Sequence, residues 1–138
     1  MAHALHPFLM FPGGGPAQAE EALTFYVSLF PGARIVALQR WGADGPGGAA
    51  RAGSVMLAAC ELAGQTVYAS DSPIQHAFGF TPSQSLYVKC EDEAELRRLA
   101  DALGQGGLAL MPVGDYGFSR LFGWVQDRFG VSWQLTLE

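Results

Sequence analysis

The feature that most constrains the fold is an internal repeat, in which one order of strand, helix and three strands occurs twice along 138 residues. Apolar periodicity and turn residues predict these elements. The first unit has strands at 7–11, 34–41, 54–61 and 65–70 and a helix at 17–30. The second has strands at 83–90, 108–113, 121–126 and 131–137 and a helix at 92–104. The sequence therefore predicts an α+β fold of two βαβββ modules.

The closing hairpins of the two units align without gaps over their turns, so that Tyr68 takes the place of Gln134. In the last strand, apolar side chains alternate with the polar Ser132, Gln134 and Thr136, which share one face. A buried polar side chain needs a partner or a cavity. We therefore expect Gln134 to point into a ligand pocket.

The length favours a single domain over residues 1–138, with module 1 at about 5–72, a connector at 73–82 and module 2 at about 83–138. A curved sheet with one helix on its back leaves a face that the other module must cover. A cleft between the modules is the expected ligand site.

The helix signals are specific. Pro16 fits a first helical turn, and Glu20 and Glu21 favour a helix N-terminus. Asp92 with Glu95 resembles a capping box at the start of the second helix. Leu96, Leu99, Ala100 and Leu103 form its apolar stripe.

The composition limits the kinds of partner. The net charge is -5 and no basic run occurs, so we expect no nucleic-acid binding. No apolar stretch approaches the roughly 20 residues of a membrane span, and the N-terminus does not resemble a signal peptide. Cys60 and Cys90 are interpreted as free, buried thiols of a cytoplasmic protein.

Four segments resemble a known family: Phe8-Leu9-Met10-Phe11, Glu21-Ala22-Leu23-Thr24-Phe25-Tyr26, 76–82 and 123–134. With the double βαβββ pattern, the chain resembles the vicinal-oxygen-chelate superfamily, and within it the PhnB-like family, often labelled 3-demethylubiquinone-9 3-methyltransferase. The resemblance implies the glyoxalase/bleomycin-resistance/dioxygenase-like fold, with curved mixed sheets around a cleft. It also implies a small-molecule ligand and a homodimer.

The superfamily's metalloenzymes place their metal ligands at four strand positions. The resemblance puts His6, Tyr68, Ser85 and Gln134 there. Only His6 and Gln134 are suited to a divalent metal, and catalytic sites usually offer about three protein ligands. We therefore expect no metal. The alternative is a Zn, Ni or Mn site with His6, Gln134 and either Glu61 or His76.

The methyltransferase label lacks a matching motif. The segment 104–109 spells G-x-G-x-x-A, but it follows the second predicted helix and precedes a strand. Binding of a phosphate or cofactor by such a turn needs the opposite order, with the helix N-terminus after the turn. We interpret the segment as a helix stop.

The expected ligand-binding residues are six side chains near the cleft strands and the connector. They are Tyr68, His76, Ser85, Tyr87, Trp133 and Gln134. His76 is the candidate catalytic base, with Asp71 as the one nearby carboxylate to orient it. Alternatively, His76 is a structural histidine bonded to the backbone at the seam between the modules. For His6, the alternative to a metal ligand is an exposed side chain in a frayed N-terminus.

The loop before the last hairpin has two interpretations. Asp115 and Arg120 either hold a charged ligand group or form a surface salt bridge, and Tyr116 with Phe118 either form a lid or pack as ordinary loop residues. Three functions stay open: a metal-free small-molecule-binding protein, a metal-dependent glyoxalase-type lyase or transferase, and a non-catalytic dimer that sequesters a drug or metabolite.

Overall fold

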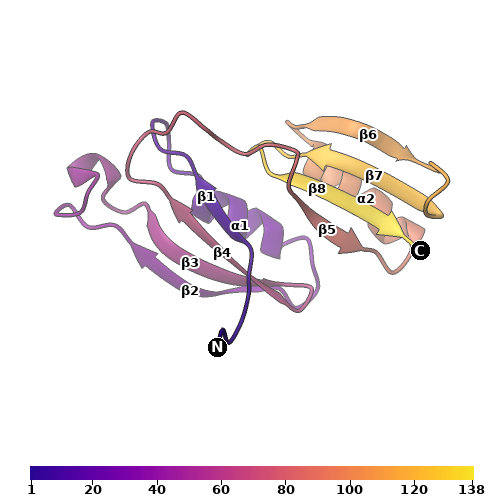
Figure 1. Ribbon diagram of the computed structural model, residues 1–138, viewed down its shortest axis with the longest axis horizontal. Helices are drawn as coiled ribbons and strands as arrows, with labels where there is room; N and C mark the ends of the chain where they lie inside the picture. Colours follow the sequence, from indigo (N-terminus) through magenta and orange to yellow (C-terminus); the bar gives the residue numbers. More distant parts are fainter. The chain divides into compact units, whose positions relative to one another are not determined.

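The computed structural model describes residues 1–138 and contains two compact units, 1–79 and 80–138 (Figure 1). The first unit contains β1 (Phe8–Phe11), α1 (Ala19–Val27), β2 (Arg34–Arg40), the 3-10 helix η1 (Gly48–Arg51), β3 (Val55–Leu62) and β4 (Gln65–Asp71). The second contains β5 (Ser85–Lys89), α2 (Glu93–Gly104), β6 (Leu108–Gly114), β7 (Leu121–Gln126) and β8 (Ser132–Leu137). The predicted βαβββ repeat is confirmed, and η1 lies between the strands predicted at 34–41 and 54–61.

Each unit holds one mixed, open sheet of four strands. The strand orders are β1-β4-β3-β2 and β5-β8-β7-β6, and only the pairs β1–β4 and β5–β8 are parallel. Tyr68 stands opposite Phe8 and Ala59, whereas Gln134 stands opposite Tyr87 and Trp124. Tyr68 and Gln134 therefore each stand between the two neighbouring strands of their sheet, but the gapless alignment of the hairpins is wrong by one residue on the side of β3 and β7, because it matches Ala59 with Val125 whereas Gln134 stands opposite Trp124.

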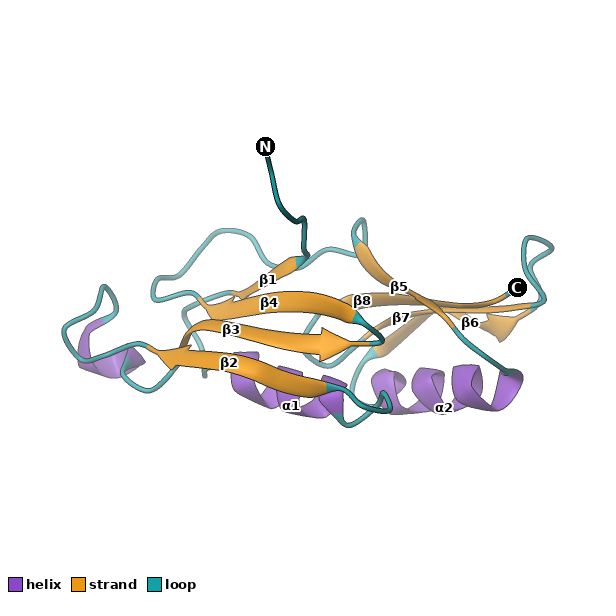
Figure 2. Ribbon diagram, turned by 90° about the horizontal axis from the view of Figure 1, so that it is seen from below, coloured by secondary structure: helices purple, strands orange, loops and turns teal.

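One helix packs on one face of each sheet, which Figure 2 shows from the side. In the second unit, Leu96, Leu99 and Leu103 of α2 are fully buried. They meet the face of β7 and β8 that carries Val125, Trp133, Leu135 and Leu137, all of them buried. The apolar stripe of α2 is confirmed for the three leucines, while Ala100 is half-buried. The alternation in β8 thus places Trp133 in the core.

The helix α1 is shorter than the predicted 17–30. It begins at Ala19 because the buried carboxylate of Asp71, at the end of β4, accepts hydrogen bonds from Gln18 N and Ala19 N, both at 2.9 Å. Pro16 therefore lies before the helix and not in its first turn. At the other end Ser28 N bonds to Phe25 O at 3.1 Å, and such three-residue hydrogen bonds close the last turn.

The predicted capping of α2 is confirmed. Asp92 accepts a hydrogen bond from Glu95 N at 2.8 Å, and the Glu95 carboxylate accepts one from Glu91 N at 2.8 Å. Gly104 is the last helical residue, and the G-x-G-x-x-A segment runs from this C-terminus into β6. The interpretation of that segment as a helix stop is confirmed, because it presents no helix N-terminus.

A buried carboxylate organises the turn between β7 and β8. Asp127 Oδ1 accepts hydrogen bonds from Phe129 N at 2.9 Å and Val131 N at 3.0 Å. Its Oδ2 accepts one from Trp133 Nε1 at 2.9 Å. Gly130 has a φ of 91°, which closes the turn in the left-handed region. Asp127 thus fixes the hairpin turn and orients Trp133 toward the core.

Both cysteines are buried and free, as predicted. Burial raises the pKa of the Cys60 thiol to about 11. The pKa of the Cys90 thiol is also raised to about 11, mainly by burial. Both side chains are therefore neutral thiols near pH 7. Neither helix is long and apolar enough to cross a membrane.

Candidate functional site

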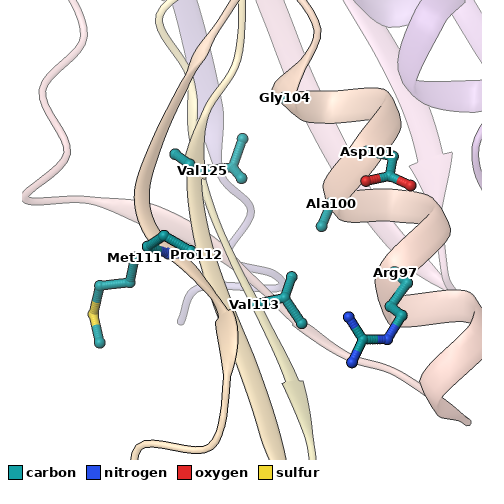
Figure 3. A pocket seen from close by; sticks show the side chains of 9 residues that line it. Arg97, Ala100, Asp101, Gly104, Met111, Pro112, Val113 and Val125 are labelled. Atoms are coloured by element: carbon teal, nitrogen blue, oxygen red, sulfur yellow. The ribbon is translucent and has the colours of Figure 1, made fainter.

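The candidate site is the helix-free face of the second sheet, which we define as the face turned away from α2. Cross-strand partners share a face, and so do alternate residues along each strand. Val125 borders a hollow with Ala100 and Gly104 of α2, which marks the helix side. Met111, the β6 partner of Trp124, also borders that hollow, but in Figure 3 its side chain extends away from α2. The helix-free face carries Ser85, Tyr87, Lys89, Met111, Phe122, Trp124, Gln126, Ser132, Gln134 and Thr136.

A row of side chains able to contact a ligand crosses three strands on this face. Tyr87, Gln134 and Trp124 are consecutive partners in β5, β8 and β7. The Tyr87 side chain is 59% exposed, and Gln134 and Trp124 are half-buried. The Gln134 carboxamide has no hydrogen-bond partner within the chain. The row therefore combines two aromatic rings with one amide that is free to bind a ligand.

A short chain of hydrogen bonds lies beside this row. Trp124 Nε1 donates to Ser132 Oγ at 2.8 Å, and Ser132 Oγ lies 2.6 Å from Ser85 Oγ. Ser132 is buried, whereas Ser85 is half-buried. The predicted site residue Ser85 is thus connected to the indole of Trp124 through a serine that the sequence had indicated only by its alternation with Gln134.

A hollow of about 660 Å³ borders the same face near the end of β8. It is lined by Tyr87, Asp115, Gly117, Phe118, Ser119, Arg120, Thr136 and Glu138. Thr136 is only 2% exposed, and its hydroxyl has no hydrogen-bond partner within the chain. No buried side-chain N or O atom is both unpaired and sealed from the surface, so the Thr136 hydroxyl reaches the hollow. An unpaired hydroxyl on a largely buried side chain can form a hydrogen bond with a polar ligand atom in the hollow.

The 115–120 loop forms the wall of this hollow. Asp115 Oδ1 accepts a hydrogen bond from Gly117 N at 2.9 Å, which fixes the turn. The Phe118 ring lies edge-on to Phe122 of the helix-free face, with centroids 4.9 Å apart, and stacks on Tyr116 at 6.2 Å. The loop is therefore attached to the sheet through aromatic contacts, while 64% of Phe118 remains exposed.

Arg120 and Asp115 do not form the salt bridge that was one of the two interpretations of this loop. Arg120 Nε instead donates to the Glu138 backbone oxygen, and the Glu138 carboxylate pairs with Lys89 at 2.9 Å. The guanidinium nitrogens beyond Nε have no partner within the chain. Arg120 thus brings a positively charged group to the hollow.

The other predicted residues lie elsewhere. Trp133 is 1% exposed and lies on the helix side of β8, so it does not join Gln134. His76 and Tyr68 belong to the first unit. His76 Nε2 lies 2.7 Å from Ser72 Oγ, and its ring stacks on Phe78 at 4.7 Å. Ser72 therefore orients His76, in place of the expected Asp71, whose carboxylate binds backbone N–H groups.

His6 is held against β4. Its Nδ1 lies 3.1 Å from Thr66 O and 3.1 Å from Gln65 Nε2, and its ring contacts Tyr68 edge-on. If Nδ1 carries the proton and donates to Thr66 O, Nε2 is left as the acceptor atom. The chain contains no group of three or more His, Cys, Asp or Glu side chains placed to hold a metal ion.

A second hollow, of about 340 Å³, lies between α2 and β6 (Figure 3). Its lining is mainly apolar, with Arg97 and Asp101 as the charged members. Arg97 Nε already donates to Glu93 at 2.8 Å. None of the predicted site residues lines this hollow, so the helix-free face remains the stronger candidate.

Comparisons with known proteins agree with this architecture. The family model described as 3-demethylubiquinone-9 3-methyltransferase matches residues 3–136. The PhnB protein from Bacillus cereus is 46% identical over 99% of this chain and 100% of its own, with a TM-score of 0.89. Protein PA1353 from Pseudomonas aeruginosa is 29% identical, covering 99% of this chain and 98% of its own, with a TM-score of 0.78.

A more distant match concerns the fold alone. A glyoxylase/bleomycin resistance protein/dioxygenase domain from Frankia sp. EAN1pec is 12% identical, covers 99% of this chain and 92% of its own, and has a TM-score of 0.65. No curated protein matches the chain. The two repeated modules, with one helix and one mixed sheet each, have the glyoxalase/bleomycin-resistance fold.

Proposed function

Since the chain belongs to the family described as 3-demethylubiquinone-9 3-methyltransferase, we propose that it is a PhnB-like small-molecule-binding protein whose ligand lies on the helix-free face of the second sheet. The observation that carries this proposal is the hydroxyl of Thr136, a residue that is only 2% exposed, because this hydroxyl is unpaired within the chain and accessible from the hollow. Buried polar groups are normally hydrogen-bonded, so an unpaired one at a hollow indicates a partner that comes from outside the chain.

The side chains beside Thr136 on the sheet support a flat ligand with neutral hydrogen-bonding groups, and Arg120 adds a positive charge at the hollow. Gln134, two residues away on the same face, offers both a donor and an acceptor. Tyr87 and Trp124 flank it in the same row and present aromatic surface. Ser85 adds a hydroxyl at the next position along β5. Of the predicted set, Ser85, Tyr87 and Gln134 belong to this face. Trp133 faces the core, and Tyr68 and His76 belong to the first unit.

We propose that binding requires no metal. Of the four positions where the superfamily places metal ligands, Tyr68 and Ser85 carry hydroxyl groups, which are poor ligands for divalent metals at neutral pH. Ser85 is also hydrogen-bonded to Ser132. Only His6 and Gln134 remain as donors, fewer than a catalytic zinc site normally uses. The donor set therefore does not fit a glyoxalase-type centre, and no reaction step is assigned to a metal.

Methyl transfer has no support in the backbone. The glycine-rich segment at 104–109 leads from the C-terminus of α2, where carbonyl groups point outward, into β6. A helix N-terminus, which supplies N–H groups to a cofactor, is absent from this segment. The proposal is therefore a binding function with the reaction left unassigned. We propose a homodimer, as the superfamily resemblance implies, and a cytoplasmic location, as the free cysteines suggest.

The test is a fragment screen by NMR on the intact, ¹⁵N-labelled chain, followed by titration of the hits into variants. Thr136→Val keeps the shape and removes the hydroxyl, and Thr24→Val, at an exposed position of α1, is the matched control. We expect hits to shift the amides of Tyr87, Gln134 and Thr136. Thr136→Val should weaken their binding by roughly 5- to 10-fold, as for the loss of one buried hydrogen bond.

Two results would overturn the proposal. One is a screen in which no compound perturbs the helix-free face. The other is a set of hits that bind Thr136→Val as tightly as the unmodified chain. The metal-free part is tested separately by melting curves with Zn²⁺, Ni²⁺ or Mn²⁺ and with a chelator. A metal that binds only the folded state raises its stability by about 2.7 kcal/mol at a hundredfold excess over Kd, and such a rise would contradict it.

A further inference from the structure

The geometry points to Ser85 as a hydrogen-bond donor aimed at an oxygen atom of the ligand, held in that role by the chain Trp124–Ser132–Ser85. This inference rests on the proposed function and names the ligand class: a planar, neutral compound with a carbonyl or quinone-like oxygen. It assigns a contact with the ligand to Ser85 and positioning roles to Ser132 and Trp124.

The direction of the hydrogen bonds follows from the donor at one end. An indole N–H can only donate, so the bond at 2.8 Å makes Ser132 Oγ an acceptor from Trp124. Ser132 is 2% exposed, and its own proton therefore needs a partner inside the protein. The other side chain bonded to it is Ser85, at 2.6 Å. Ser132 thus donates to Ser85 Oγ.

The opposite direction would leave a buried proton without an acceptor. If Ser85 donated to Ser132, the Ser132 oxygen would receive two hydrogen bonds while its own O–H had no recorded acceptor. Because an unmade buried hydrogen bond is the costly case, the first arrangement is favoured. In that arrangement the Ser85 proton is not used within the pair.

The free proton of Ser85 lies on the helix-free face. Ser85 is half-buried, precedes Tyr87 by two residues in β5 and stands opposite Ser132 in β8. A hydroxyl that already accepts a hydrogen bond from a polarised neighbour is a stronger donor, since hydrogen bonds in a chain reinforce one another. The Ser85 O–H is therefore prepared to donate to a ligand oxygen.

The surroundings select a neutral oxygen acceptor. Gln134 adds its NH₂ group, and the half-buried indole of Trp124 and the ring of Tyr87 provide flat apolar surface. The cation nearest to Ser85 in sequence, Lys89, is paired with Glu138 at 2.9 Å, and Arg120 lies at the hollow near the end of β8, which Ser85 does not line. Ser85 has another serine beside it and no histidine bonded to it, so the arrangement suits donation of a hydrogen bond and not nucleophilic attack.

The experiment compares two probes that differ mainly in one carbonyl oxygen, 4-hydroxyacetophenone and 4-ethylphenol. Both are titrated by NMR into the full ¹⁵N-labelled chain. We expect 4-hydroxyacetophenone to bind at the helix-free face roughly fivefold or more tightly than 4-ethylphenol, as one hydrogen bond allows. Ser85→Ala should abolish this preference, and Ser85→Thr, which keeps a hydroxyl, should retain it.

The positioning residues have their own readout. Ser132→Ala removes the acceptor of the Trp124 indole N–H, so that resonance should move upfield and the carbonyl preference should fall. Trp124→Phe should lower the preference in the same way. Ser83→Ala, at an exposed serine that bonds to Thr81, is the matched control and should change neither quantity.

Three outcomes would overturn the inference. They are equal binding of both probes, no binding of 4-hydroxyacetophenone at this face, and an unchanged preference in Ser85→Ala. None of them removes the proposed function, which fails if either the fragment screen or the titration of Thr136→Val gives the negative result stated above. Failure of the donor role and failure of the binding site are thus distinguishable.

Discussion

The two modules share one backbone arrangement but carry different side chains at equivalent positions. Tyr68 stands between Phe8 and Ala59 in the first sheet, and Gln134 stands between Tyr87 and Trp124 in the second. The first row holds one polar atom, the phenol oxygen, whereas the second adds an amide and an indole N–H. A repeated fold therefore fixes where side chains stand, while their chemistry differs between the copies.

The buried carboxylates show a second difference between the modules. Asp71 accepts hydrogen bonds from Gln18 N, Ala19 N and Val55 N, and so caps α1 from a distant strand. The helix α2 has a local cap, Asp92, and the buried Asp127 of its module organises the last hairpin instead. The buried Asp71 thus joins segments that are far apart in sequence, whereas the buried Asp127 acts within a single hairpin.

The largest expected effect comes from removing these carboxylates. Asp71→Ala and Asp127→Ala each leave three N–H groups without their acceptor, and we expect a loss of about 3–4 kcal/mol of unfolding free energy. Asp92→Ala removes one exposed cap and should cost about 1 kcal/mol. Urea unfolding of the three variants measures the differences.

Hydrogen exchange distinguishes the structural roles of Asp71 and Asp127. Asp71→Ala should lower protection first in α1, and Asp127→Ala first in β7 and β8. Asp71→Asn and Asp127→Asn serve where the alanine variants do not fold. If Asp92→Ala proved as damaging as Asp71→Ala, the contrast between a local and a distant cap would be wrong.

An intermediate effect is expected at one closely packed glycine of each module. A Cβ atom at Gly13 would lie 2.1 Å from Ile74 O, and one at Gly107 would lie 2.2 Å from Gln126 O. Because backbone atoms must move to relieve these contacts, each Gly→Ala change should cost about 2–3 kcal/mol. The matched controls Gly15→Ala and Gly104→Ala meet no atom within 4 Å.

The controls also differ from each other. Gly15→Ala should change the unfolding free energy by less than about 0.5 kcal/mol. Gly104→Ala, in the last turn of α2, should raise it by about 0.5–1 kcal/mol because alanine favours a helix. Thermal unfolding of the four variants gives the order, and a Gly13→Ala variant as stable as Gly15→Ala would show that the 13–15 loop moves away from Ile74 freely.

The fold could be predicted where the signals are local. The turns at 62–64 and 127–130 set the register of the hairpins, and Asp92 with Glu95 marked the start of α2. The start of α1 could not be predicted, because its cap lies more than 50 residues away in sequence at Asp71. Pro16 and the glutamates indicated a helix, but not the residue at which it begins.

The site was predicted in part for a similar reason. Alternation puts Gln134 on the face away from the core, and the same alternation puts Trp133, a predicted ligand-binding residue, on the opposite face. Thr136 and Ser132 share the face of Gln134, but nothing local shows which hydroxyl finds a partner. That distinction depends on Trp124, which donates to Ser132 across the sheet and leaves Thr136 unpaired.

The smallest expected effect concerns an ion pair that joins α1 to β2 in the first module. Arg40 donates from Nη1 and Nη2 to the two carboxylate oxygens of Glu20, both at 2.8 Å. This hydrogen bonding lowers the pKa of Glu20 below its usual 4.5, while burial opposes the shift. A carboxylate with a lowered pKa in the folded state adds stability above pH 4.5, and that stability is lost as the pH falls through the lowered value.

Glu20→Gln should therefore lower stability slightly at pH 7 and reduce the difference from the unmodified chain as the pH falls below 4.5. The side chains of Glu20 and Arg40 are about half exposed, so the loss of stability in Glu20→Gln should be smaller than the losses expected for the buried carboxylates and the closely packed glycines. It should also be weaker at high salt. Glu93→Gln, in the local pair with Arg97 on α2, is the matched control. Acid unfolding curves at low and high salt measure both, and a pH-independent difference for Glu20→Gln would mean that this pair adds packing without charge.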